Sequence, residues 1–81
     1  MTNIIARMRV QFGRTYWVGG ITKHKGHPFI VHCTHEHPTR AEAKDCAEAM
    51  CYSDEGSQTA DLLRKHGITL AECRAALAKV A

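Results

Sequence analysis

The chain lacks any long apolar segment, and this absence sets the first expectations. No run approaches the roughly 18 apolar residues that a membrane-spanning helix needs. Residues 1–10 include Arg7 and Arg9 and have no apolar stretch of the length that a secretory signal requires. We therefore expect a cytoplasmic protein whose four cysteines are reduced thiols.

The sequence also lacks the arrangements that usually carry catalysis. Gly19-Gly20 has neither the lysine nor the following helix of a phosphate-binding loop. The adjacent carboxylates Asp54 and Glu55 lie in a linker-like stretch. Cys33 has His32 beside it, but no recognisable loop to hold an oxyanion or a substrate accompanies the pair. We predict no enzyme activity, no catalytic residue and no cofactor.

The 81 residues leave room for one domain with a small core, and their charge is unevenly distributed. Residues 1–44 contain seven Lys and Arg against two acids, a net charge of +5, whereas residues 45–81 contain four against six, a net charge of −2. A basic half predicts a surface for phosphate or for an acidic protein. The alternative is that these side chains are simply solvated.

The first half of the chain carries patterns typical of three antiparallel strands. Apolar and polar residues alternate over residues 4–12, and residues 15–22 are rich in β-branched and aromatic side chains. Gly13-Arg14 between them predicts a two-residue type II′ turn. Gly19-Gly20 predicts a bulge in the second strand. Residues 28–35 form the third predicted strand.

The second half predicts helices. Thr39 to Glu42 fits a capping box that starts a helix from Arg40 to about residue 52, and Thr69 to Glu72 fits another that starts a last helix to about residue 80. Between them, a helix from about residue 58 should end near Gly67. The predicted fold class is α+β. A three-stranded antiparallel sheet packed on one helix (1–52, β-β-β-α) is followed by a linker (53–57) and a helical pair (58–81), in a single domain, 1–81.

The open face of the sheet is the first candidate binding surface. If the helix covers the side of Met8 and Val10, the other side should show Arg7, Arg9 and Trp17. Basic and aromatic residues on such a face can hold phosphates and stack bases. The alternative is that the helical pair covers this face. The predicted partner-binding residues are Arg7, Arg9, Trp17, Lys23, Lys25 and Arg40.

Three short strands followed by Pro38-Thr39-Arg40-Ala41-Glu42-Ala43-Lys44 resemble the arm-type DNA-binding domain of phage integrases. Over about residues 4–52 the same pattern resembles small phage proteins, anti-CRISPR proteins among them. The resemblance implies a non-enzymatic inhibitor that docks on a nucleic-acid-handling complex, such as a CRISPR effector, in the host-cell cytoplasm and blocks it sterically. The alternative is a direct DNA- or RNA-binding module that uses the basic sheet face. A homodimer through an exposed strand edge stays open.

The helical pair resembles a helix-turn-helix, with Gly67 in the turn. The groove-facing positions would offer Leu70, Ala71 and Glu72, which are poor ligands for DNA. An ordinary αα-hairpin that closes the core is the alternative, and the favoured one.

Cys33-Thr34-His35-Glu36-His37 places three metal-ligand types at alternate positions, where they would face the same way on a strand. Cys46 or Cys51 on the following helix could complete the tetrahedral N/S site that zinc prefers. Against this, the chain has no C-x-x-C pair, and the cysteines also fit as buried small apolar residues. A zinc-stabilised module held by Cys33, His35, His37 and Cys46 is therefore a minor alternative to a chain without metal.

Overall fold

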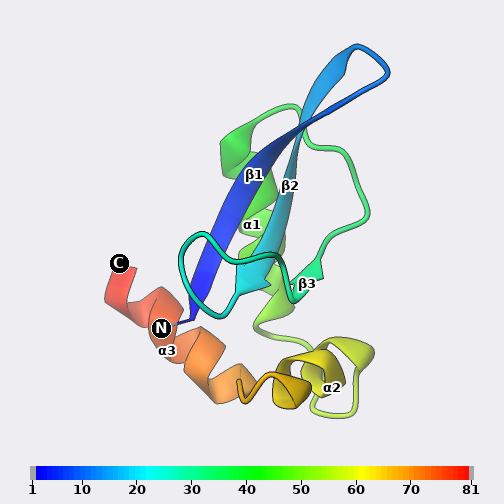
Figure 1. Ribbon diagram of the computed structural model, residues 1–81. Coiled ribbons are helices and arrows are strands. Elements are labelled where there is room, and N and C mark those ends of the chain that lie inside the picture. The colour runs from blue at the N-terminus through cyan, green and yellow to red at the C-terminus, as the bar shows by residue number, and fades with distance from the viewer. Residues whose placement is uncertain (1, 81) are drawn as a thin grey trace.

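The computed structural model describes residues 2–80, and the side chains of residues 2–78. Its elements in chain order are β1 (Asn3–Gln11), β2 (Arg14–Thr22), β3 (Val31–His32), α1 (Arg40–Met50), α2 (Gln58–Lys65) and α3 (Leu70–Val80). The strands form an antiparallel sheet in the order β1-β2-β3 (Figure 1). The predicted α+β class is therefore confirmed. Within the described residues, no helix has both the length and the apolar character needed to cross a membrane.

The hairpin of β1 and β2, here called the ribbon, turns one residue earlier than predicted. Phe12 and Gly13 both have positive φ, at 52° and 75°, and Gln11 pairs with Arg14. Positive φ at both central positions defines a type I′ turn, whose twist matches that of the flanking strands. The predicted type II′ turn at Gly13-Arg14 is therefore wrong. The register moves by two residues, so that Tyr16 lies opposite Arg9 instead of Gln11.

The glycine pair of β2 serves close packing rather than a bulge. The ladder runs unbroken through Ala6↔Gly19 and Ile5↔Gly20, so the predicted bulge is wrong. A Cβ on Gly19 would lie 1.8 Å from the carbonyl oxygen of Ala43 on α1. A Cβ on Gly20 would lie 2.5 Å from the ring of Phe29. In Figure 1, α1 lies behind the ribbon and the loop before β3 crosses in front of it.

The helices begin where the sequence predicts. The side-chain oxygens of Thr39 and Thr69 accept hydrogen bonds from the backbone N–H groups of Glu42 (3.2 Å) and Glu72 (3.1 Å). These contacts satisfy amides that have no partner inside the helix. Gly67, with φ 76°, follows the end of α2.

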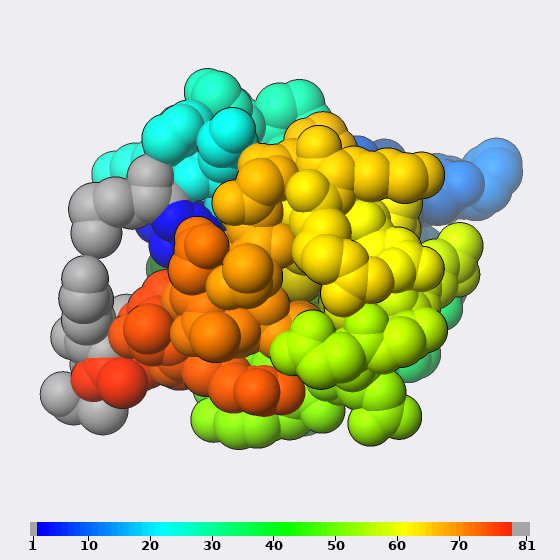
Figure 2. Space-filling model, turned by 90° about the horizontal axis from the view of Figure 1, so that it is seen from below, coloured from blue at the N-terminus to red at the C-terminus, as the bar shows by residue number. Residues whose placement is uncertain are grey.

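The helical pair closes the core at the end of the sheet where β1 begins and β2 ends (Figures 1 and 2). This arrangement supports the αα-hairpin interpretation. Near the hairpin turn, no helix in the described part of the chain covers the face of the ribbon that lies opposite to α1. The main cluster of buried apolar residues joins β2 and β3 to the helical pair and to the residue that follows α1: Ile21, Val31, Cys51, Ala60, Leu63, Ile68, Leu70 and Cys73.

Candidate metal centre

The segment after β3 leaves the sheet and then returns to it. The predicted third strand over residues 28–35 is wrong in length, because β3 covers only Val31–His32. Cys33 still donates its N–H to the carbonyl of Gly19 (2.9 Å), and His37 exchanges two backbone hydrogen bonds with Trp17 (2.9 and 3.0 Å). Residues 34–36 therefore stand opposite Val18 alone, as a bulge. Residues 33–37 are called the ligand segment below.

This bulge brings four metal-ligand side chains together. The Sγ atoms of Cys33 and Cys46 and one ring nitrogen each of His35 and His37 all lie within 4.8 Å of one another. The sequence predicted this set for the wrong reason, since the ligand segment is not a regular strand. Cys46 joins it from α1, where the cap at Thr39 fixes the helix start and so the direction of the cysteine.

Two of the six ligand–ligand distances match the edges of a zinc tetrahedron. Nδ1 of His35 lies 3.4 Å from Nε2 of His37 and 3.5 Å from Sγ of Cys46. With Zn–S near 2.3 Å and Zn–N near 2.05 Å, tetrahedral geometry gives N···N edges of about 3.3 Å and S···N edges of about 3.5 Å. These two distances therefore already suit the ion.

Contacts from the sheet orient the Cys33 sulfur. The N–H of Gly19 donates to Cys33 Sγ at 3.4 Å, a contact that fixes the position of the sulfur. The Cys33 thiol in turn lies 3.7 Å from the carbonyl oxygen of His35. Burial, followed by the neighbouring Cys33 sulfur, raises the pKa of the Cys46 thiol. The Cys46 thiol is therefore harder to ionise than a free cysteine in the absence of a nearby positive charge.

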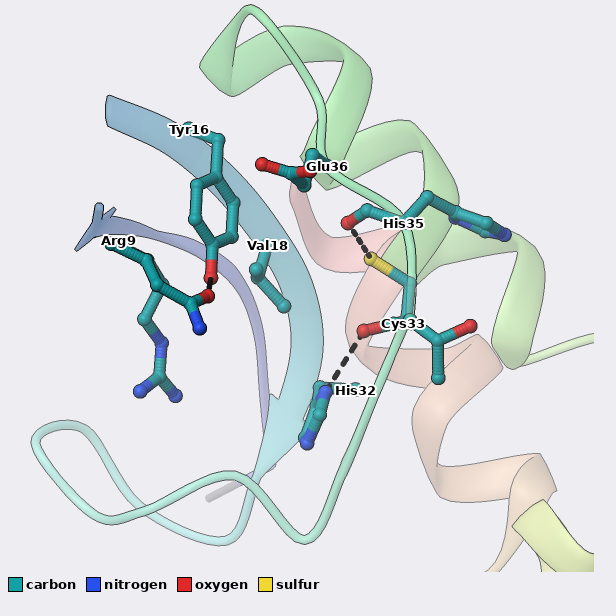
Figure 3. Close-up of a pocket in the computed structure, with 9 residues that line it drawn as sticks. Arg9, Tyr16, Val18, His32, Cys33, His35 and Glu36 are labelled. Carbon is teal, nitrogen blue, oxygen red and sulfur yellow. Dashed lines mark hydrogen bonds between the residues drawn. The ribbon is translucent and has the colours of Figure 1, made fainter. Parts of the chain in front are cut away.

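Burial differs among the four ligands. Cys33 is buried, His37 and Cys46 are half-buried, and His35 is exposed. In Figure 3 the His35 ring lies on the side of the ligand segment that faces away from Arg9 and Tyr16. A metal held here would therefore sit between the ligand segment and α1, near the surface.

Cys51, the other cysteine considered for this site, lies elsewhere. Its side chain is fully buried in the main core next to Cys73, together with Leu63 and Leu70. The hydrogen bond with Cys73, followed by burial, raises the pKa of the Cys51 thiol. Cys51 is thus a neutral core residue, and Cys46 is the cysteine that lies beside the ligand segment.

The predicted partner-binding residues do not form one cluster. Arg7 donates to the carbonyl of His27 and lies over the Phe29 ring, 4.8 Å from its centroid. Trp17 is half-buried and pairs across the ribbon with Met8, on the face opposite to Arg9. The expectation that Trp17 shares a face with Arg9 is therefore wrong, and its role in binding stays a prediction. The remaining members of the set are exposed: Arg9, Lys23, Lys25 and Arg40.

Sequence reasoning missed Tyr16. It lies opposite Arg9, and its hydroxyl donates to Oε1 of Gln11 at 3.0 Å. The alternation of side chains along a strand could have identified it, because Tyr16 and Trp17 must point to opposite faces of the sheet.

Comparison of the chain with models of protein families, with curated proteins and with solved structures finds no match.

Proposed function

We propose that the protein is a small non-enzymatic binding module whose fold is completed by one zinc ion held by Cys33, His35, His37 and Cys46. The observation that carries the proposal is the convergence of the four ligand atoms within 4.8 Å, three from the ligand segment and one from α1. Two sulfur and two imidazole donors in tetrahedral reach are the donor set typical of zinc.

The role of this ion is structural. Four protein ligands fill a tetrahedral coordination sphere, so no position remains for a reactive water. The ion would tie the ligand segment, which has only three backbone hydrogen bonds to β2, onto α1. A chain of 81 residues has a small core, and metal ligation is one of the usual means of stabilising domains of this size.

The binding role follows from surface charge. Residues 1–32 contain five Lys and Arg and no Asp or Glu, so the ribbon and the loop after it contribute only positive charge, of which Arg14 is paired with Glu36. A fixed loop beside such a surface suits recognition of an anionic partner. Docking on a nucleic-acid-handling protein complex, with inhibition of that complex, stays a prediction.

Zinc content tests the proposal. Protein purified from zinc-supplemented medium and desalted should contain about one zinc per chain by elemental analysis. Cys46→Ser and His37→Ala should lower that content severalfold, because each removes a ligand.

Cys51→Ala is the matched control, since it removes a buried thiol of similar size outside the site and should keep the zinc. Zinc-free wild-type protein, or equal zinc content in Cys46→Ser and wild type, would contradict the proposal.

A further inference from the structure

An open groove lies on the face of the sheet that α1 does not cover. Its volume is about 510 Å³. One side is the ribbon, through Arg9, Gln11, Tyr16 and Val18, and the other is the chain from His32 to Glu36 (Figure 3). Since most of the ligand segment forms the second side, the groove rests on the proposed zinc site for its shape.

One cation in the groove is free to bind an anion. Glu36 is the single acid that lines it, and the Glu36 carboxylate pairs with Arg14 at 3.0 Å. Among the residues that the structure describes, Arg9 is exposed and has no ion pair or hydrogen-bond partner of its side chain. The Arg9 guanidinium therefore presents an uncompensated positive charge at the groove.

Aromatic side chains line the groove beside this charge. The hydrogen bond from the Tyr16 hydroxyl to Gln11 restrains the Tyr16 ring next to Arg9. Nδ1 of His32 lies 2.8 Å from the carbonyl oxygen of Cys33, a contact that holds the imidazole ring at the groove. The lining thus combines a cation, an aromatic ring and an imidazole ring.

We propose that this groove binds single-stranded nucleic acid, with Arg9 on a phosphate and the Tyr16 ring against a base. Basic grooves with aromatic side chains are the usual sites for single strands. The ribbon and the loop after it, residues 1–32, contain no acid, and their positive charge would attract a polyanion. The groove has the volume of a small-molecule site, about 300–1,000 Å³, which suits part of one strand and not a duplex.

The groove fits a protein partner less well. Protein interfaces have an apolar centre, whereas the groove lining is mostly polar. The exposed apolar side chains Met8 and Val10 lie on the opposite face of the ribbon, with Trp17 and Thr15 as their cross-strand partners.

The test is fluorescence anisotropy of labelled single-stranded DNA and RNA with zinc-loaded protein over a range of salt concentrations. Wild type should bind with a negative log–log salt slope. Arg9→Ala should weaken binding about tenfold or more and reduce the slope by about 0.7, the value for one phosphate contact on a single strand. Tyr16→Leu should weaken binding at least about fivefold, and Tyr16→Phe should largely retain it, because the ring remains.

Lys65→Ala on α2 is the matched control, since it removes one exposed positive charge at a site outside the groove. Its affinity should stay within about twofold of wild type. Equal losses in Arg9→Ala and Lys65→Ala would overturn the proposal, as would tighter binding of duplex DNA than of single strands. Capture of an acidic protein through Arg9 without any binding of nucleic acid would also overturn it.

Zinc content, measured on the same samples, separates this proposal from the preceding one. One zinc per chain without strand binding at low salt would overturn the groove alone. Arg9-dependent strand binding by a protein without zinc would support the groove and contradict the zinc module.

Discussion

Sγ of Cys46 lies 3.5 Å from Nδ1 of His35, a contact that joins α1 to the ligand segment across the edge of the sheet. The two residues are eleven positions apart in sequence, and the chain between them is held by the backbone hydrogen bonds of His37 with Trp17 and of Ala43 with Thr39. The contact therefore comes from the folded backbone, and a bound metal would lock a geometry that is already present.

Zinc should raise the thermal stability of the protein. At free zinc about 100 times above its Kd, a ligand that binds only the native state adds about 2.7 kcal/mol. For a domain of this size, that corresponds to a rise in Tm of roughly 10–20 °C. Differential scanning fluorimetry with zinc and with a chelator measures it. A Tm that the chelator leaves unchanged would argue against a structural ion.

His37→Ala should abolish the zinc-dependent part of this stability. His37 is a half-buried ligand, whereas His27 is an exposed histidine outside the cluster. His27→Ala is therefore the matched control, and its Tm should still respond to zinc as wild type does. The same zinc response in both variants would remove His37 from the site. Fluorimetry with added zinc and with chelator distinguishes the two outcomes.

Gly19→Ala should unfold much of the protein. The new Cβ would lie 1.8 Å from the carbonyl oxygen of Ala43 and 3.1 Å from Cβ of Ala47, and backbone cannot give way as a flexible side chain can. We expect a loss of at least about 3 kcal/mol, the upper range for overpacking. Zinc affinity should fall as well, since Gly19 orients Cys33.

Gly56→Ala provides the control for this substitution. A Cβ there meets nothing within 4 Å, so its stability should stay within about 0.5 kcal/mol of wild type. Urea unfolding followed by circular dichroism measures both variants. If Gly19→Ala unfolded at the same urea concentration as wild type, α1 would not pack on β2 as described.

The strand alternation and the capping residues let the sequence predict the class, the element order and the helix starts. The sequence did not predict that β3 is short, because the two-residue repeat of Val31, Cys33 and His35 looks the same in a strand and in a bulge. The four metal candidates were found by residue type, but their convergence depends on backbone contacts between His37 and Trp17 that no local pattern encodes. The groove depends on the ribbon register, which the turn at Phe12-Gly13 sets.

Phe12→Asn should stabilise the protein by about 0.5–1 kcal/mol. Phe12 has φ 52°, a conformation that asparagine tolerates better, and its side chain is 90% exposed and so has little packing to lose. Phe12→Ala keeps the unfavourable φ and should show no such gain. Urea unfolding of the two variants measures the difference. Destabilisation by Phe12→Asn would mean that the Phe12 ring makes contacts that the structure does not show.

Thr22→Val should also stabilise the protein, by about 1 kcal/mol. Thr22 is fully buried, and its hydroxyl has no hydrogen-bond partner among the described residues. Replacing an unsatisfied buried hydroxyl with a methyl group of similar shape removes the cost of desolvating it. Thr15→Val, at an exposed position of the same strand, should change the stability by less than about 0.5 kcal/mol. A less stable Thr22→Val variant would mean that the hydroxyl has a partner.

X-ray absorption at the zinc edge of the loaded protein tests the central claim most directly, because it reports the ligand atoms themselves. We predict two sulfur neighbours at about 2.3 Å and two nitrogen neighbours at about 2.0–2.1 Å, from Cys33, Cys46, His35 and His37. In Cys46→Ser, one sulfur neighbour should be lost. A shell of oxygen and nitrogen alone, without sulfur, would contradict the site and the function proposed on it.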